Sequence, residues 1–208
     1  MLSDFRFDRL FIGGAWASPV DGGVRPSIDP ARGTPWGDVA YGGVRDIDRA
    51  VAAAKDAFEQ WRKMPPWERA ALMRRFADLY ATQVDALAEI ETRDNGRAVR
   101  ESRGDIGLHA QYYHWFASLA DKLGGRTIPM DDSVHAFTTR HPVGVVGAIT
   151  PWNVPLMAAA WKLGPALAAG CTVVLKPAEQ TPASSLALAR VFEAAGFSAG
   201  GGERGAGG

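Results

Sequence analysis

The chain has 208 residues, and its 23 basic and 23 acidic side chains give a formal net charge of zero. This balance provides no electrostatic attraction to nucleic acid or to an anionic membrane, so neither is expected as a partner. No run of about 18 apolar residues is present, so no segment is predicted to span a bilayer.

The amino terminus and the cysteine content predict where the protein resides. Charged side chains interrupt the first ten residues, which therefore lack the apolar stretch of a signal peptide. A single cysteine, Cys171, excludes an internal disulfide framework and fits a reducing compartment. We therefore expect a cytoplasmic protein.

The first half of the chain predicts a hairpin followed by helices. Residues 10–16, LFIGGAW, place β-forming residues around a Gly-Gly pair that can adopt the positive φ angles of a tight turn. Residues 18–45 are rich in Gly, Pro and Asp and are predicted to be loop with brief strands. Helical periodicity then predicts a helix capped by Asp46, a second that opens at Pro66, a third that ends at Asn95-Gly96, and a fourth over 99–123.

The last third changes to an α/β pattern. Residues 135–140 alternate like an edge strand, and residues 143–149 form a nearly continuous apolar run, which is typical of a strand covered on both faces. A helix at 156–169, a second buried strand at 171–175 and a helix at 182–195 are expected next. This order predicts a parallel sheet with right-handed crossovers, in which ligands bind beyond the carboxyl ends of the strands.

Polar residues follow both predicted strands. Lys176 can donate to ribose hydroxyls or attract phosphate, and Glu179 can accept from ribose hydroxyls. An ordinary solvated loop with two charges explains the same spacing equally well. Asn153 could direct its amide at a developing oxyanion, although on pattern alone a turn or helix-cap asparagine explains it better.

Several separated motifs resemble those of the NAD(P)-dependent aldehyde dehydrogenase superfamily. They are LFIGGAW, the DPARG turn at 29–33, the helix DIDRAVAAAKDAFEQW, the segment ETRDNGRAVRES, and the ITPWN and LKPAEQT motifs at 149–153 and 175–181. Their shared order makes the resemblance specific. It implies an α/β fold with a hairpin and helical part at 1–125, oligomerisation-type strands at 126–142 and the first βαβα unit of a dinucleotide-binding sheet at 143–197.

The resemblance also implies roles for individual residues. Asn153 corresponds to the side chain that stabilises the thiohemiacetal oxyanion, and Lys176 and Glu179 correspond to the pair that holds the adenosine ribose. A carboxylate at that place repels a 2′-phosphate, so NAD is expected as cofactor, with NADP as the alternative. No metal site is expected. The loop along the nicotinamide end of the cofactor corresponds to Ile149, Thr150, Pro151 and Trp152.

The family's nucleophilic cysteine and its general base have no counterpart in this sequence. Cys171 starts a predicted buried strand, and without a neighbouring base we expect it to be structural. Since family members are longer, we expect a truncated amino-terminal part of an aldehyde-oxidising, homo-oligomeric enzyme, without activity of its own. The alternative is a non-catalytic fragment that binds nucleotide or associates with other subunits.

An aromatic cluster on the predicted helix 99–123 has two interpretations. The first is packing within the helical layer. The second is a contribution to the wall of the aldehyde pocket, which would favour an apolar or aromatic aldehyde. The residues concerned are Tyr112, Tyr113, Trp115 and Phe116.

Residues 198–208 contain six glycines in eleven residues and show no periodicity, which predicts a linker. The resemblance implies a continuation close to PPGVVNVVPG at this point. One base inserted after the codon of Phe197 converts a coding sequence for that continuation into one for the observed SAGGGERGAGG. We therefore predict a frameshift at this position. The nucleotide sequence tests the prediction, which fails if no +1 frame encodes VVNVV.

Overall fold

The structure, a computed structural model, describes residues 6–197, and the predicted frameshifted tail at 198–208 lies outside that range. Its strands are β1 (Leu10–Ile12), β2 (Ala15–Ala17), β3 (Gly23–Asp29), β4 (Thr34–Tyr41), β5 (Thr127–Ile128), β6 (Ala136–Phe137), β7 (Val145–Ile149) and β8 (Thr172–Lys176). Its helices are α1 (Val44–Trp61), α2 (Pro66–Ala81), α3 (Val84–Asn95), α4 (Val99–Leu119), α5 (Pro155–Ala168) and α6 (Ala183–Ala195). The α/β prediction is confirmed.

Two antiparallel hairpins open the chain. Gly13 and Gly14, at φ 60° and 77°, form the tight turn between β1 and β2, as the sequence predicts. Residues 18–45, predicted to be loop with brief strands, contain strands that are longer than predicted, because β3 and β4 pair from Gly23–Tyr41 to Asp29–Thr34 with one irregularity between Ser27 and Ile28. Their turn is held by the Asp29 carboxylate, which accepts from the Ala31 N–H at 2.9 Å. The strands carry mostly exposed residues and so lack the alternation that marks a half-buried strand.

The predicted helices are present, but the ends of two of them differ from the prediction. Asp46 is not the cap of α1 but lies in its first turn, where its buried carboxylate accepts from the N–H groups of Gly43 and Val20 at 3.1 and 3.0 Å. Helix α4 ends at Leu119 instead of 123. The chain beyond it enters the β5–β6 arm, where a Cβ on Gly125 would lie 1.7 Å from the Thr138 carbonyl oxygen, so the close backbone approach requires glycine there.

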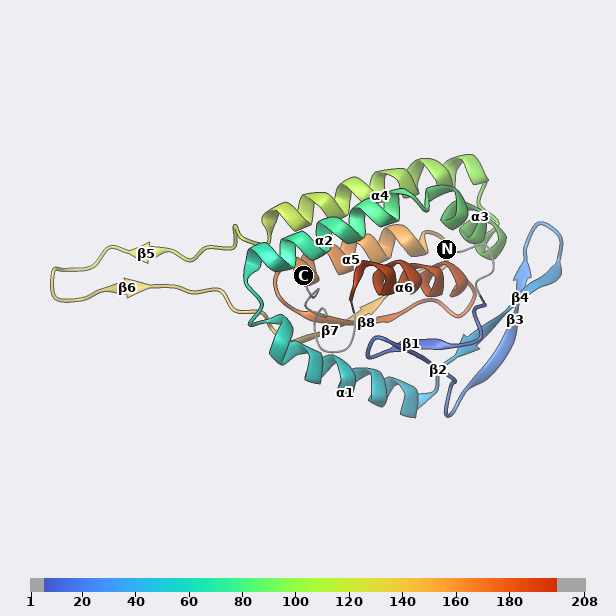
Figure 1. The fold of residues 1–208 in the computed structure, drawn as a ribbon, viewed down its shortest axis with the longest axis horizontal. Helices are drawn as coiled ribbons and strands as arrows, with labels where there is room; N and C mark the ends of the chain where they lie inside the picture. Colours follow the sequence, from blue (N-terminus) through green and yellow to red (C-terminus); the bar gives the residue numbers. More distant parts are fainter. Residues whose placement is uncertain (1–5, 198–208) are drawn as a thin grey trace, which may run out of the picture.

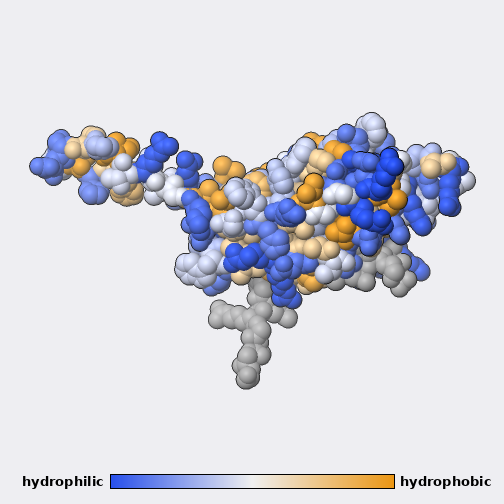
Figure 2. Space-filling model, turned by 90° about the horizontal axis from the view of Figure 1, so that it is seen from above, coloured by the Kyte–Doolittle hydropathy of each residue, from blue (hydrophilic) through white to orange (hydrophobic). Residues whose placement is uncertain are grey.

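The parallel pair β7–β8 lies between two unequal layers (Figure 1). Helix α1 covers one face, whereas α5 covers the other face and packs in turn against α4 and α6. The β5–β6 hairpin projects from this body as an arm, also visible in the view from above in Figure 2. The predicted strand at 135–140 is reduced to Ala136–Phe137. Over residues 6–197, no helix has both the length and the apolar character that crossing a bilayer requires.

Two polar side chains lie inside the helical layers. Arg69 is buried and donates to the carbonyl oxygens of Ala168 at 3.2 Å and Met64 at 3.1 Å. It therefore satisfies the Ala168 carbonyl at the carboxyl end of α5, where a positive charge is favourable, and a carbonyl of the turn between α1 and α2. His109 is buried as well, with its Nδ1 3.1 Å from the Tyr80 hydroxyl.

A close approach of α4 and α5 depends on Gly164. A Cβ built there would lie 2.7 Å from Cδ2 of Phe116. We expect Gly164→Ala to lower the free energy of unfolding by about 1–3 kcal/mol through overpacking. Gly104 on α4 has open space around its Cβ position, so Gly104→Ala should raise stability by about 0.5–1 kcal/mol. Urea unfolding measures the stability of both variants. Equal effects of Gly164→Ala and Gly104→Ala would contradict the close approach of Gly164 to Phe116.

Candidate functional site

The carboxyl ends of β7 and β8 lie side by side. The strands are parallel and in register from the pair Val145–Thr172 to the pair Ile149–Lys176. The Thr150 N–H donates to the Lys176 carbonyl at 3.1 Å, which continues the ladder one residue past the strand. The two loops that follow the strands, 150–154 and 177–182, therefore leave the sheet at one common edge, where parallel sheets bind ligands.

The residues that the sequence singles out are brought together at this edge, and all but one are exposed. Ile149 is 69% exposed and Trp152 is 59% exposed. Thr150 is the exception, because its side chain is buried and its hydroxyl has no hydrogen-bond partner among the described residues. The remaining exposed members are Pro151, Asn153, Lys176 and Glu179.

Hydrogen bonds hold the two loops to each other and to the strands. The Thr181 hydroxyl donates to the Trp152 carbonyl at 3.2 Å, which ties the β8 loop to the β7 loop. The Lys176 ammonium donates to the Pro177 carbonyl at 3.2 Å. The Tyr41 hydroxyl, at the end of β4, donates to the Glu179 carbonyl. The backbone at Glu179 is thus fixed while its carboxylate stays exposed to solvent.

The carboxyl end of α3 braces both loops, a feature that the sequence analysis missed. The Glu91 carboxylate accepts from the Leu156 N–H in the first turn of α5, at 3.3 Å. The Asp94 carboxylate accepts from the Ala183 N–H, the first residue of α6, at 2.8 Å, and from the Ser27 hydroxyl at 2.7 Å. We call Glu91, Asp94 and Asn95 the α3 brace.

The third member of the α3 brace acts on the β7 loop directly. The Asn95 amide donates to the Asn153 carbonyl at 3.2 Å. The spacing of 91, 94 and 95 on one helix is the signal in the sequence, since residues three and four apart share a helix face. Their partners lie 65, 89 and 58 residues away, however, so only the tertiary structure reveals the contacts.

Burial changes the protonation of the two acidic members of the α3 brace. Burial raises the pKa of Glu91 to about 7, against the opposing effects of the Leu156 N–H and Arg97. Burial likewise raises the pKa of Asp94 to about 6, although the Ser27 hydroxyl and the Ala183 N–H favour its charged form. Both carboxylates face helix amino termini, where negative charge is favourable.

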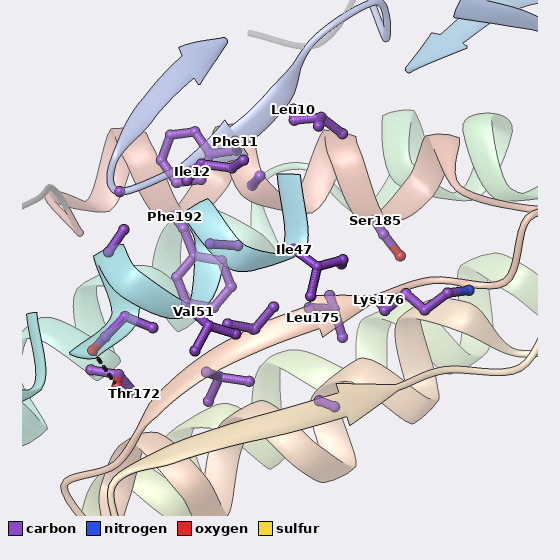
Figure 3. Close-up of a pocket in the computed structure, with 18 of the residues that line it drawn as sticks. Leu10, Phe11, Ile12, Ile47, Val51, Thr172, Leu175, Lys176, Ser185 and Phe192 are labelled. Carbon is purple, nitrogen blue, oxygen red and sulfur yellow. Dashed lines mark hydrogen bonds between the residues drawn. The ribbon is translucent and has the colours of Figure 1, made fainter. Parts of the chain in front are cut away.

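A cavity of about 1120 Å³ reaches the same edge (Figure 3). Side chains from β1, α1, β8 and α6 surround it, and most of them are apolar. Lys176 and Glu179 line it at the edge, together with Ile149. The exposed residues of the edge therefore adjoin an apolar space inside the protein.

The aromatic cluster on α4 divides between core and surface. Tyr113 is buried against Phe76, with ring centroids 4.8 Å apart, so its prediction as a pocket wall is wrong. Phe116 packs on Gly164. Tyr112 and Trp115 are exposed, at 42% and 62%. The packing interpretation therefore holds for Tyr113 and Phe116, which contact other helices of the layer.

Neither the cysteine nor the histidines form a reactive centre in the described part of the chain. Cys171 is a free thiol, 4% exposed, directly before β8. Because it is buried, this thiol is not accessible to a substrate. Within residues 6–197, no group of three or more His, Cys, Asp and Glu side chains is placed to hold a metal ion.

Comparisons with known proteins agree on one family. The profile of the aldehyde dehydrogenase family matches residues 16–201. Mitochondrial benzaldehyde dehydrogenase of Antirrhinum majus is 43% identical over 195 residues, which are 92% of this chain and 36% of that protein. The crystal structure of betaine aldehyde dehydrogenase of Staphylococcus aureus in complex with NAD+ superimposes with a TM-score of 0.90 at 36% identity, over 95% of this chain and 40% of that one.

An Escherichia coli structure described as an NADP dependent enzyme gives the same result, with a TM-score of 0.90 at 38% identity over 99% of this chain and 44% of that chain. The chain therefore belongs to the aldehyde dehydrogenase family, and the α/β architecture expected from the resemblance is confirmed. It spans about 40% of the length of the relatives that it matches.

Proposed function

We propose that this chain supplies the first half of an NAD-binding site in a protein that oxidises aldehydes. The observation that carries the proposal is the common edge at which the loops after β7 and β8 present Ile149, Lys176 and Glu179 to solvent. An exposed carboxylate and an exposed ammonium three residues apart fit the vicinal hydroxyls of a ribose. The NAD complex of the similar betaine aldehyde dehydrogenase supports this cofactor.

The residues of the edge have distinct proposed roles toward the dinucleotide. Glu179 accepts from the ribose hydroxyls and disfavours a 2′-phosphate by charge repulsion, while Lys176 donates to the same ribose. Ile149 offers an apolar surface, and the backbone of 150–152 lines the nicotinamide end. When bound, NAD supplies the acceptor for the hydride that leaves the aldehyde carbon.

The proposed role of Asn153 is oxyanion stabilisation. Its side chain is exposed while its backbone carbonyl is fixed by Asn95. An amide N–H directed at an aldehyde oxygen from this position would stabilise the negative charge that develops there. We further propose an apolar or aromatic aldehyde as substrate, since the cavity that adjoins the edge is lined mostly by apolar side chains.

The cofactor site can be tested by calorimetric titration of the 208-residue chain with NAD and with NADP. Removal of an acceptor for two ribose hydroxyls should weaken NAD binding in Glu179→Ala about tenfold, the equivalent of one charged hydrogen bond. The same variant should narrow the preference for NAD over NADP. Glu59→Ala, an exposed glutamate on α1 outside the edge, serves as the matched control. Equal NAD affinity in Glu179→Ala and Glu59→Ala would contradict the proposal.

The same chain should form no NADH when given NAD and benzaldehyde. Its one cysteine is buried before β8, so no thiolate reaches the edge to attack the aldehyde. NADH formation that scales with chain concentration and disappears in Glu179→Ala would contradict this expectation.

A second candidate function is association with other subunits. The β5–β6 arm projects from the body and carries exposed apolar side chains, among them Met130 at 57% and Phe137 at 66% (Figures 1 and 2). Exposed apolar residues gathered on one element mark interaction surfaces. Light scattering after size exclusion distinguishes subunit association from NAD binding as the function. Phe137→Asp should dissociate an assembly formed by the arm and leave NAD binding unchanged.

A further inference from the structure

A second cavity lies at the root of the β5–β6 arm (Figure 1). Its volume of about 500 Å³ is in the range of pockets that bind small molecules. We call it the arm-root pocket, and its lining comes from residues 62–66, Arg69, residues 120 and 123, residues 140–142 and residues 169–170. The last two segments directly precede β7 and β8. The pocket therefore lies at the amino ends of these strands, opposite to the common edge.

The arm-root pocket is lined by basic side chains and by no acidic one. Arg62 and Lys63 follow α1, Arg69 lies on α2, and Arg140 precedes β7. Glu59, outside the pocket, forms ion pairs with Arg62 and Lys63 at 2.8 and 3.6 Å. Within residues 6–197, Arg69 and Arg140 donate only to backbone carbonyl oxygens. The pocket thus has two arginine charges that no carboxylate in this range neutralises.

Arg69 is the buried member of the basic group, with 6% of its surface exposed. Its Nε donates to the Ala168 carbonyl and its Nη1 to the Met64 carbonyl, and these two bonds use only part of the five N–H donors of a guanidinium. Burial lowers the pKa of Arg69, but an arginine stays charged at any ordinary pH. Because buried charges are normally paired, a buried arginine that lines a pocket favours an anion there.

The rest of the lining indicates which kind of anion fits. Arg140 is exposed, and its Nε donates to the Gly124 carbonyl at 3.2 Å, which holds the side chain at the root of the arm. Arginine forks match the oxygens of a phosphate, and a phosphoryl group carries about −1.5 to −2 charges at pH 7. Two arginines can balance that charge. Pro65 and Leu123 add apolar walls beside them.

We propose that the arm-root pocket binds a small organic phosphate monoester. Arg69 and Arg140 would hold the phosphoryl oxygens, and Pro65 and Leu123 would contact the organic part. Since Arg140 lies where the arm returns to the body and Arg69 holds the end of α5, a bound ligand would connect the arm to the body. The inference does not depend on the proposed cofactor role, because the two sites lie at opposite ends of the strands.

Calorimetric titration at constant ionic strength tests the class of ligand. The probes are phenyl phosphate, inorganic phosphate and benzoate. Phenyl phosphate should bind at least tenfold more tightly than benzoate, which has one charge and two oxygens for the two arginines. It should also bind more tightly than inorganic phosphate, which does not reach the apolar walls. Equal affinity for phenyl phosphate and benzoate would overturn the phosphoryl assignment, and equal affinity for the two phosphates would overturn the organic ligand.

Matched variants test the two arginines. Arg140→Gln should weaken phenyl phosphate binding at least tenfold, since it removes charged hydrogen bonds from an exposed position that the fold does not need. Arg75→Gln removes an exposed arginine of α2 outside the pocket and should bind like the parent. Arg69→Lys keeps a charge but loses the planar fork, so it should weaken binding as well. If Arg69→Lys does not fold, Arg140→Gln still decides the question. Equal affinities of Arg140→Gln and Arg75→Gln would overturn the proposal.

Amide chemical shifts show where the phosphate binds. A Cβ at Gly170 would lie 3.7 Å from Cζ of Arg69, so the Gly170 N–H is a local probe of the pocket. Phenyl phosphate should shift the Gly170 and Met64 N–H signals and leave those of Thr150 and Glu179 at the common edge unchanged. Shifts confined to the common edge would overturn the inference, because the phosphate would then occupy the proposed cofactor site.

Discussion

Phe76→Ala is expected to lower the free energy of unfolding by about 3–5 kcal/mol, the usual cost of removing a buried phenylalanine ring. Phe76 is 1% exposed and lies on α2 among rings from α4 and α6. Its ring stacks on Phe192 with centroids 3.9 Å apart and meets Tyr113 edge-on at 4.8 Å. Such aromatic pairs stabilise the folded state by more than the burial of their apolar area alone.

The position of Phe76 explains why its loss should be felt so widely. Tyr80 on the same helix and Phe197 after α6 complete the cluster, with centroids 5.9 and 6.1 Å from the Phe76 ring. Truncation to Ala leaves a cavity at the junction of three helices that cannot close without moving all of them.

Urea unfolding followed by tryptophan fluorescence measures this effect. The matched control is Phe137→Ala on the exposed arm, which should stay within about 0.5 kcal/mol of the parent. If Phe76→Ala does not fold, Phe76→Leu retains most of the volume and should still lose about 1–2 kcal/mol. A Phe76→Leu variant as stable as the parent would show that the cluster does not hold the helices together.

Much of the fold follows from periodicity that is legible in the sequence. The apolar spacing that ends at Trp61, and the spacing of Phe76 and Tyr80 on the next helix, predict α1 and α2. The run at 143–149 and the glycine after α5 predict the β7–α5–β8 unit. The carboxyl ends of those strands then indicate where Asn153 and Lys176 should meet, because strand ends in a parallel sheet share an edge.

What the sequence does not show depends on contacts between distant residues. Strands β3 and β4 are mostly exposed, so their pairing leaves no alternation in Gly23–Asp29. Arg69 looks like other surface arginines until α5 is placed above it. Glu91 and Asp94 read as charges on a helix, and only the packing of α3 against the first turns of α5 and α6 shows that they brace the site.

Glu91→Gln is expected to remove a pH dependence of stability between pH 4.5 and 7. Burial raises the pKa of Glu91 in the folded chain to about 7, from an ordinary value of 4.5. The folded state therefore holds a proton that the unfolded state releases over this interval. The stability from Glu91 is fully present below pH 4.5 and is lost as the pH rises through 7, a change on the order of 3 kcal/mol.

Other buried groups change stability over the same interval, so the difference between variant and parent is the informative quantity. Asp94, with its pKa raised to about 6, adds a loss of the same sign at lower pH. His109 acts oppositely, because burial lowers its pKa to about 4 and its contribution is lost as the pH falls from 6.5 toward 4. His109 is present in parent and variant and cancels in the difference, whereas Asp94, whose charge raises the pKa of Glu91, cancels only in part.

Urea unfolding at pH 4.5 and pH 8 provides the measurement. Glutamine keeps an oxygen that can accept from the Leu156 N–H but carries no charge, so Glu91→Gln should match the parent at pH 4.5 and exceed it at pH 8. Glu59→Gln is the control, since its exposed carboxyl is paired with Arg62 and has a lowered pKa. Parallel pH profiles for parent and Glu91→Gln would mean that the charge of Glu91 is solvated, and that the amino end of α5 beside Asn153 is not held by a buried carboxyl group.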